Sequence, residues 1–156
     1  MESARITLRW GDASDVEFVD DLGKRVVMDS VASFRRPIEA MVHVSFERLL
    51  AYVRGQSHRI IIAQADDERA GFLLLLDTMQ EEVTLMPQAF IAFMAVEPGM
   101  RRRGIARAML AEAERYARER KLPTLSMMVT EENVAARTLY ERSGFFIERR
   151  MLTKVL

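Results

Sequence analysis

The chain has 156 residues, of which 49% are hydrophobic and 29% charged, and its 23 Lys and Arg are balanced by 23 Asp and Glu. This is an ordinary globular composition, and the length predicts one domain, residues 1–156, with a core of its own. The zero net charge argues against a nucleic-acid binder, the lack of cysteine excludes disulfides and thiolate metal sites, and no apolar run is long enough to span a membrane.

The first half of the chain alternates between strand and helix patterns. Apolar alternation indicates strands, while a capping residue or a proline in the first turn marks the start of a helix. In order, we expect a strand at Ile6–Trp10, a helix capped by Asp12 or Ser14, a helix from about Pro37 to Val53, and strands Arg59–Ala65 and Ala70–Leu76 joined as a hairpin.

The second half continues the alternation and contains the most apolar strand. Residues Ala89–Val96 form an uninterrupted apolar run, which indicates a central strand covered on both faces. The remaining elements expected are a helix from Ile105 to about Leu122, a strand Thr124–Val129, a helix Asn133–Arg142, and a last strand from Phe145 to about Lys154. The pattern as a whole predicts an α/β fold with a mixed sheet.

A cationic turn separates the apolar strand from the helix that follows it. Arg101, Arg102 and Arg103 precede Gly104, and small Ala106 lies in the first helical turn. The N-terminus of a helix offers unpaired N–H groups and the positive end of its dipole, and glycine lets the backbone approach an anion closely. The segment predicts a phosphate-bearing ligand, although most Arg-rich turns are only solvated loops.

Two motifs in this half of the chain resemble those of one family. The spacing Arg101-x-x-Gly104-x-Ala106 is similar to the acyl-CoA-binding motif of the GNAT superfamily of N-acetyltransferases. A second block resembles the family's second signature, in which an Asn, an Ala and a Tyr lie on one helix that is closed by Gly-Phe. In this chain those residues are Asn133, Ala136, Tyr140, Gly144 and Phe145. The resemblance implies a GNAT-like fold, a mixed central β-sheet flanked by helices, with acetyl-CoA as cosubstrate and no metal.

The resemblance also implies which residues contact the cofactor. They are the end of the central strand, the cationic turn with the start of its helix, and one face of a later helix: Met94, Ala95, Val96, Arg101, Arg102, Arg103, Gly104, Ile105, Ala106, Asn133, Ala136 and Tyr140. Backbone groups near residues 94–96, where the strand would part from its neighbour, would bind the oxyanion and the pantetheine. Tyr140 would protonate the departing thiolate, since a phenol with a pKa near 10 can protonate a thiolate whose thiol has a pKa near 8.5.

The general base and the acceptor are less well defined. The central strand has no ionisable residue, so the base would be Glu82, its neighbour Glu81, or a chain of waters. The resemblance places the acceptor along residues 23–56, where apolar side chains and arginines suit an acceptor with a hydrophobic part. In that segment Met41, Phe46 and Leu49 are expected to form the core-facing side of their helix.

Three functions remain open. The favoured one is an acetyl-CoA-dependent N-acetyltransferase that moves the acetyl group directly to a primary amine of a small molecule or peptide in a ternary complex. Direct attack is preferred because the chain has neither cysteine nor a Gly-x-Ser-x-Gly elbow, and His43 and His58 show no metal-ligand spacing. The others are a non-catalytic acyl-CoA-binding or sensor domain, and a different phosphate-binding protein such as a nucleotide-binding domain.

The sequence predicts the cellular location, the partners and the length of the donor's acyl group only coarsely. The first residues, Met-Glu-Ser-Ala-Arg, lack the apolar core of a signal peptide, so a cytoplasmic protein without membrane or nucleic-acid partners is expected. The apolar residues of the last strand fit either a homodimer contact or the core of one chain. The donor could carry an acyl group longer than acetyl.

Overall fold

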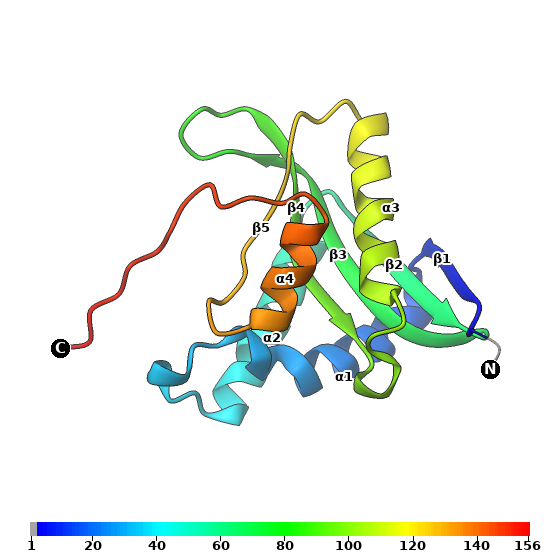
Figure 1. The fold of residues 1–156 in the computed structure, drawn as a ribbon, viewed down its shortest axis with the longest axis horizontal. Coiled ribbons are helices and arrows are strands. Elements are labelled where there is room, and N and C mark those ends of the chain that lie inside the picture. The colour runs from blue at the N-terminus through cyan, green and yellow to red at the C-terminus, as the bar shows by residue number, and fades with distance from the viewer. Residues whose placement is uncertain (1–2) are drawn as a thin grey trace.

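The computed structural model describes residues 3–156, which form a five-stranded sheet in the order β1-β2-β3-β4-β5 (Figure 1). The strands are β1 Ile6–Trp10, β2 His58–Ala65, β3 Glu68–Gln80, β4 Pro87–Val96 and β5 Leu125–Met127. All neighbours are antiparallel except β4 and β5, which are parallel, so the sheet is mixed as predicted. The β2–β3 hairpin is confirmed, with Asp66 and Asp67 at its turn.

Helices cover both faces of this sheet. They are α1 Val16–Val26, α2 Glu39–Arg54, α3 Ile105–Glu119 and α4 Val134–Arg142, with short 3₁₀ turns η1 Ala13–Asp15, η2 Val27–Ser30, η3 Ser33–Arg35 and η4 Pro98–Met100. Helices α1 and α2 pack on one face and α3 on the other, with α4 lying beside α3 (Figure 1). No helix within residues 3–156 is both long enough and apolar enough to cross a membrane.

The central strands divide their side chains between two apolar clusters. Along β3, Leu73 and Leu75 enter the cluster under α3, while Phe72 and Leu74 enter the cluster under α1 and α2, and all four are fully buried. This alternation follows from the two-residue period of a strand. Burial on both faces explains why the middle of β3, residues 70–76, and nearly all of β4 are apolar in sequence.

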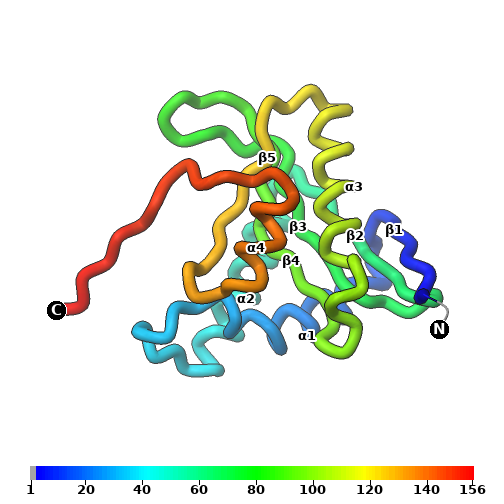
Figure 2. Tube along the Cα trace, in the orientation of Figure 1, coloured from blue at the N-terminus to red at the C-terminus, as the bar shows by residue number. Residues whose placement is uncertain are grey.

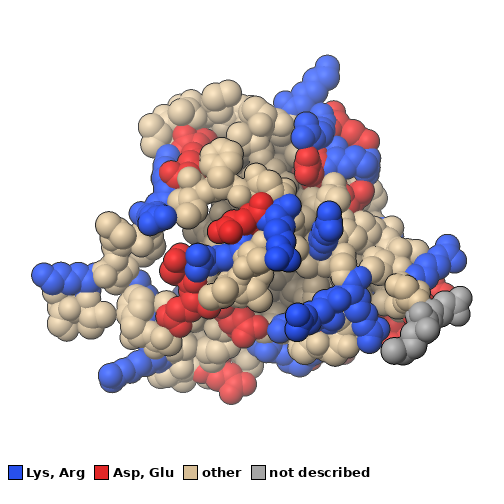
Figure 3. Space-filling view, in the orientation of Figure 1, with Lys and Arg blue, Asp and Glu red and all other residues tan. Residues whose placement is uncertain are grey.

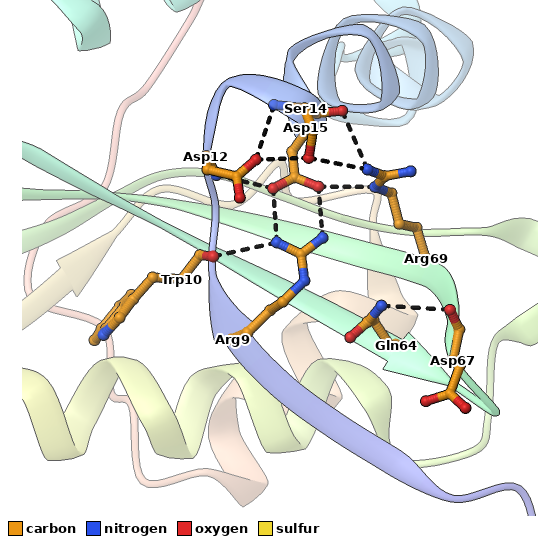
Figure 4. Close-up of polar contacts among 8 residues, drawn as sticks. All are labelled: Arg9, Trp10, Asp12, Ser14, Asp15, Gln64, Asp67 and Arg69. Atoms are coloured by element: carbon orange, nitrogen blue, oxygen red, sulfur yellow. Dashed lines mark hydrogen bonds and ion pairs between the residues drawn. The ribbon is translucent and has the colours of Figure 1, made fainter.

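A buried carboxylate connects the N-terminal strand to the rest of the molecule (Figure 4). Asp15, which is 1% exposed, accepts two hydrogen bonds of 2.7 Å from Arg9 and one of 2.7 Å from Arg69. The Arg9 guanidinium, a backbone N–H donor from Asp12 and the Arg69 guanidinium hold the pKa of Asp15 well below its ordinary value despite burial. Asp12 also caps the turn before α1 by accepting from the Ser14 N–H, as predicted.

Two sequence-based predictions about apolar residues are wrong. Met41 was expected in the core-facing side of α2 but is 68% exposed, whereas Phe46 is buried and Leu49 packs against the core. The last strand, expected from Phe145 to about Lys154, is not formed, and residues 145–156 adopt no regular structure. A strand needs a hydrogen-bonding partner, which local sequence preference cannot supply, and none of the described residues provides one here.

Candidate active site

The parallel pairing between β4 and β5 stops half-way along β4. It joins residues 89–91 to residues 125–127, and beyond Ile91 the described chain pairs with β4 only through β3. Apolar residues in this unpaired half, such as Phe93, Met94 and Val96, are only partly buried. Backbone groups on the open edge of residues 92–96 are therefore available to a ligand. This separation of β4 from its neighbour agrees with the sequence-based prediction.

A bulge distorts β4 within the open half. Ala92 is unopposed, because Ile91 and Phe93 on either side of it pair with consecutive residues of β3. A bulge increases the local twist and changes the direction in which backbone groups point. The free backbone groups were expected near residues 94–96, whereas the bulge in the structure lies slightly earlier, at Ala92. An uninterrupted apolar run gives no local signal for where such an extra residue falls.

The turn between β4 and α3 has an unusual backbone. Gly104, the N-cap residue of α3, has φ +82°, Arg102 has φ +64°, and no side chain caps the helix. Left-handed residues in a turn can direct successive N–H groups into one concave anion-binding surface. The first N–H groups of α3, from Ile105 onward, have no acceptor within the helix. The turn therefore fits a phosphate group.

Arginines surround this turn. Arg101, Arg102 and Arg103 are exposed, and Figure 3 shows Lys and Arg side chains gathered on the face that carries the β4–α3 turn. Arg101 Nε donates to the Val96 carbonyl at 3.4 Å, and Arg101 Nη2 lies 3.6 Å from the Asp29 carboxylate. An exposed ion pair of this kind contributes less than about 1 kcal/mol. A phosphate group can consequently replace Asp29 as the partner of Arg101.

Helix α4 brings the second motif to the open half of β4. The side-chain oxygen of Asn133 caps α4 by accepting from the Ala136 N–H at 3.2 Å, which leaves the Asn133 amide NH₂ free as a donor. Tyr140 is half-buried and packs against the same apolar cluster as Met94 and Val96 of β4. The structure thus gathers the predicted cofactor-binding segments from β4, the β4–α3 turn and α4 around one opening.

The phenol of Tyr140 has the environment of a proton donor. Its ring lies edge-on to Phe145 with centroids 6.0 Å apart, and burial raises the pKa of Tyr140 above its ordinary value of 10.0. The phenol is therefore protonated at neutral pH, as it would be at its ordinary pKa, and it holds a proton that it can transfer to a leaving thiolate.

The two acidic candidates for a base lie at the other end of β4. Glu81 and Glu82 belong to the β3–β4 loop, and the strand from Pro87 to Met94 is roughly 23 Å long. Both carboxylates form ion pairs with Arg149. Hydrogen bonds from the Thr84 N–H and then the Thr84 hydroxyl lower the pKa of Glu81, which weakens it as a base. The structure therefore does not place either carboxylate beside the opening.

The loop between α1 and α2, residues 27–38, contacts segments on both sides of the opening, and Figure 2 shows it beside the segment between β5 and α4. On the β4 side, the end of α1 contributes Arg25, whose guanidinium donates to both carboxylate oxygens of Glu97 at 2.6 and 3.1 Å. Asp29, within the loop, faces Arg101. These contacts join the loop to the turn that fits a phosphate group.

On the other side, the same loop is attached to the segment between β5 and α4. The Thr130 hydroxyl donates to the Ser30 carbonyl at 2.5 Å. The Ser33 N–H and hydroxyl donate to the Glu132 carboxylate at 2.9 and 3.0 Å. Sequence reasoning missed all of these linking residues, because their partners lie about a hundred positions away and no motif connects them. Only the assignment of residues 23–56 to the acceptor side pointed to this region.

The geometry has a counterpart in a known family. The model of the acetyltransferase (GNAT) family matches residues 28–145, more than half of the chain and including every segment around the opening. The chain belongs to the GNAT family. No curated protein sequence gave a significant match.

Solved structures of this family share the fold along nearly the whole chain. A presumed acetyltransferase from Pyrococcus furiosus superposes with a TM-score of 0.82 at 22% identity, covering 97% of this chain and 100% of that one. The aminoglycoside N-acetyltransferase AAC(6')-Iy in complex with CoA gives 0.70 at 18%, covering 99% and 97%. A ribosomal-protein-alanine N-acetyltransferase from Brucella melitensis gives 0.69 at 18%, covering 97% and 99%.

The GNAT assignment agrees with the chemistry that the site offers. The opening supplies backbone hydrogen-bonding groups along β4, an uncapped helix N-terminus with arginines at one end, and a half-buried phenol at its side. This donor set suits an elongated ligand with phosphates at one end and an acyl thioester at the other. Within residues 3–156, no group of three His, Asp or Glu side chains is placed to hold a metal ion.

Proposed function

We propose that this GNAT protein is a cytoplasmic N-acetyltransferase, with residues 1–156 as one catalytic domain, that moves the acetyl group of acetyl-CoA directly to a primary amine. The observation that carries the proposal is the opening between β4 and β5, which has a phosphate-suited turn at one end and Tyr140 at its side. The family match supports the donor, and a solved relative was crystallised with CoA.

Each part of the opening has a role in binding the donor. Backbone N–H groups of Gly104, Ile105 and Ala106, with the three arginines before them, would hold the pyrophosphate. The free edge of residues 94–96 would hydrogen-bond the pantetheine arm, with the Asn133 amide as a further donor and Ala136 leaving room for the arm. This arrangement fixes the position of the thioester before the acceptor arrives.

The reaction then requires three events. The neutral amine attacks the thioester carbon, and the carbon–oxygen double bond becomes an oxyanion that backbone N–H groups near the Ala92 bulge can stabilise. The carbon–sulfur bond breaks, and the Tyr140 hydroxyl gives its proton to the departing thiolate. The amine loses its extra proton to a base, for which we retain Glu82, reached through water because its carboxylate lies beyond the far end of β4.

The acceptor is proposed as an amine on a small molecule or a peptide. Two structural relatives act on such groups, an aminoglycoside and a ribosomal-protein alanine. The α1–α2 loop bridges the opening and carries exposed Phe34 together with Arg35 and Arg36, which suits an acceptor with an apolar part and a negative group.

A non-catalytic acyl-CoA sensor is the second candidate function. One observation favours it: the open half of β4 contains no ionisable residue, and the acidic loop is bound to Arg149. A sensor would bind acetyl-CoA in the same opening without releasing CoA.

Calorimetric titration with acetyl-CoA, CoA, ATP and NAD is the first test. Micromolar binding of acetyl-CoA and CoA, without comparable binding of ATP or NAD, is the expected result. Release of free thiol in the presence of amine acceptors would then separate the transferase from the sensor, and the absence of cysteine in the chain removes protein background from a thiol assay. A folded protein that does not bind CoA would refute both functions.

A further inference from the structure

One face of β4 is turned toward α1 and α2 and is only partly covered. Side chains alternate along the strand, so Ala89 and Ile91 enter the cluster under α3, while Phe90 and Ala92 pack at the margin of the cluster under α1 and α2. Neither Phe90 nor Ala92 is fully buried. Val31 of the α1–α2 loop packs against the same cluster. An acceptor that approaches the opening from the side of this loop would therefore lie along this face of β4.

Gln88 carries an unused hydrogen-bond donor on this face. It lies two residues before Phe90 and is 7% exposed. The Ser126 hydroxyl of β5 donates to its side-chain oxygen at 3.0 Å, and Ser126 points to this face because Leu125 and Met127 pack on the other one. Within residues 3–156 nothing accepts from the Gln88 NH₂ group, which is not sealed from solvent. A nearly buried amide with free N–H donors fits a carbonyl oxygen of a ligand.

No ionisable side chain of the described chain lines this face. Strands β4 and β5 contain none. On β3, Asp77 accepts from Tyr116 of α3 and so belongs to the opposite face of the sheet. The residues of α1 and α2 that face the sheet are apolar, and His43 lies outside that set, beside Glu39. The helices and strands that enclose this face therefore provide no base.

The ionisable groups at the margins of the opening provide no free base either. Each carboxylate there has a partner within the described residues: Asp29, Glu81, Glu82, Glu97, Glu131 and Glu132. The other groups hold their own protons at neutral pH: Arg25, Arg35, Arg36 and Tyr140. An ammonium ion bound along β4 would find no free group beside it to take its proton. The acceptor must therefore arrive as the neutral amine.

The pKa of the acceptor amine then decides how much of it can react. A peptide α-amine has a pKa of about 8, so roughly a tenth of it is neutral at pH 7. A lysine-type amine, with a pKa of about 10.4, is neutral in roughly one molecule in 2,500. The α-amine of a peptide is also followed by carbonyl oxygens. Gln88 lies four residues before Ala92, roughly 13 Å along β4, a distance that about three or four extended peptide residues would span.

We propose that the acceptor is a weakly basic α-amino amide, as at the N-terminus of a peptide, which binds in its neutral form along this face of β4 and accepts a hydrogen bond from Gln88. The inference rests on the acetyltransferase function proposed above. The amine nitrogen bonds to the thioester carbon as the carbon–sulfur bond breaks. The proton that the nitrogen then loses leaves through water toward Glu82, and Tyr140 supplies the proton of the departing thiolate. Gln88 is a positioning residue, since it contacts the acceptor away from the reacting atoms.

The pH dependence of kcat/KM for two matched peptides tests the neutral amine. One peptide has a free N-terminal alanine and no lysine, and the other has a blocked N-terminus and one lysine. For the first, kcat/KM should rise about tenfold per pH unit and level off near a pH of about 8. For the second it should be at least about tenfold lower at pH 7 and should still rise above pH 9. A bend at the same pH for both peptides would reveal a base on the enzyme and overturn the proposal.

The same assay separates this inference from the function on which it rests. Thiol release with alkylamines but not with the N-terminal peptide would overturn the inference and leave the acetyltransferase function standing. No thiol release with any amine, from protein that binds acetyl-CoA, would instead refute the acetyltransferase function.

The role of Gln88 is tested by acceptor length. Gln88→Met keeps a side chain of similar length and removes the donor, so KM for a tetrapeptide should rise about tenfold with little change in kcat. KM for alaninamide, which is too short to reach Gln88, should not change. Ser126→Ala removes only the hydrogen bond that orients the amide and should give a smaller increase. The control Gln64→Met, on β2, should match the wild type. An equal change in KM for both acceptors, or none, would remove Gln88 from this role.

Discussion

The half-buried position of Tyr140 suits its phenol to one chemical role, the donation of a proton. Its burial beside Phe145 raises the pKa of the phenol, so the proton is retained across the neutral range. The same burial places the ring against the apolar cluster that also receives Met94 and Val96. Tyr140 therefore already carries the proton that it would donate.

The Tyr140→Phe variant is expected to lower kcat by roughly a hundredfold, the lower end of general acid catalysis, with little change in the affinity for CoA. The ring and its packing remain, and only the proton donor is lost. In the wild type, kcat should stay high until the pH approaches the raised pKa of Tyr140 and should fall above it, and this alkaline limb should be absent in the variant. Steady-state kinetics with calorimetry would measure both, and an unchanged kcat would remove Tyr140 from the acid role.

Asp15 affects stability and not chemistry, since it connects β1 and β3 to the start of α1. The Asp15→Asn variant should lose about 2 kcal/mol of unfolding free energy at pH 7, below the full value for a buried pair because Arg9 and Arg69 are about one-third exposed. The carboxylate has a depressed pKa in the folded state. Its stabilisation is therefore complete above the ordinary pKa of 3.8 and is lost as the pH falls toward the folded-state value.

Urea unfolding at several pH values measures this difference. The gap between wild type and Asp15→Asn should narrow in acid, while the control Asp67→Asn, at the β2–β3 turn, should match the wild type throughout. A gap that stays constant down to pH 2 would show that the Asp15 charge is not the cause.

In the β4–α3 turn, two substitutions of Gly104 can separate an effect on stability from an effect on CoA binding. A Cβ at Gly104 would meet no atom within 4 Å, but the residue has φ +82°. Gly104→Ala should therefore cost about 1 kcal/mol of stability through backbone strain while still binding CoA. Gly104→Glu should abolish binding, because a carboxylate would occupy the phosphate position. Thermal unfolding and calorimetry report the two effects, and equal affinity in both variants would mean that the phosphate site lies elsewhere.

The ion pair between Asp29 and Arg101 leads to a further prediction, because in the proposed site Asp29 would compete with phosphate for Arg101. Asp29→Asn should tighten CoA binding about twofold to threefold, and the gain should shrink at high salt as the ion pair is screened. Asp67→Asn makes the same change in net charge at the β2–β3 turn and should leave the affinity unchanged. Equal tightening in both variants would assign the effect to net charge alone.

Elements that depend on local signals were predictable from the sequence. The polar residues around Asp66 and Asp67 mark a turn, the apolar run of β4 marks a buried strand, and Gly104 before Ile105 marks a helix start. The Ala92 bulge was not predictable, because register depends on how β3 and β4 fit together. The contacts Arg25–Glu97 and Ser33–Glu132 were equally hidden, since they join charged or polar residues that any solvated surface could carry.

For the whole molecule, the two motifs predicted the family, which the family model confirms, and the alternating patterns predicted the order of elements as far as α4. Residues 145–156 contain strand-forming side chains such as Phe145, Ile147 and Val155. Whether they become a strand depends on a partner edge, and the nearest edge in their own chain, β5, is left unpaired. Local sequence encodes the tendency to form a strand, but not whether a partner edge is present to complete it.

The contact between Tyr140 and Phe145 connects α4 to the residues that follow it. The Phe145 N–H donates to the Tyr140 carbonyl at 3.0 Å, and the two rings are in contact, so the residues after α4 are attached directly to the helix that holds the phenol, and a shift of residues 145–156 would shift the proton donor as well.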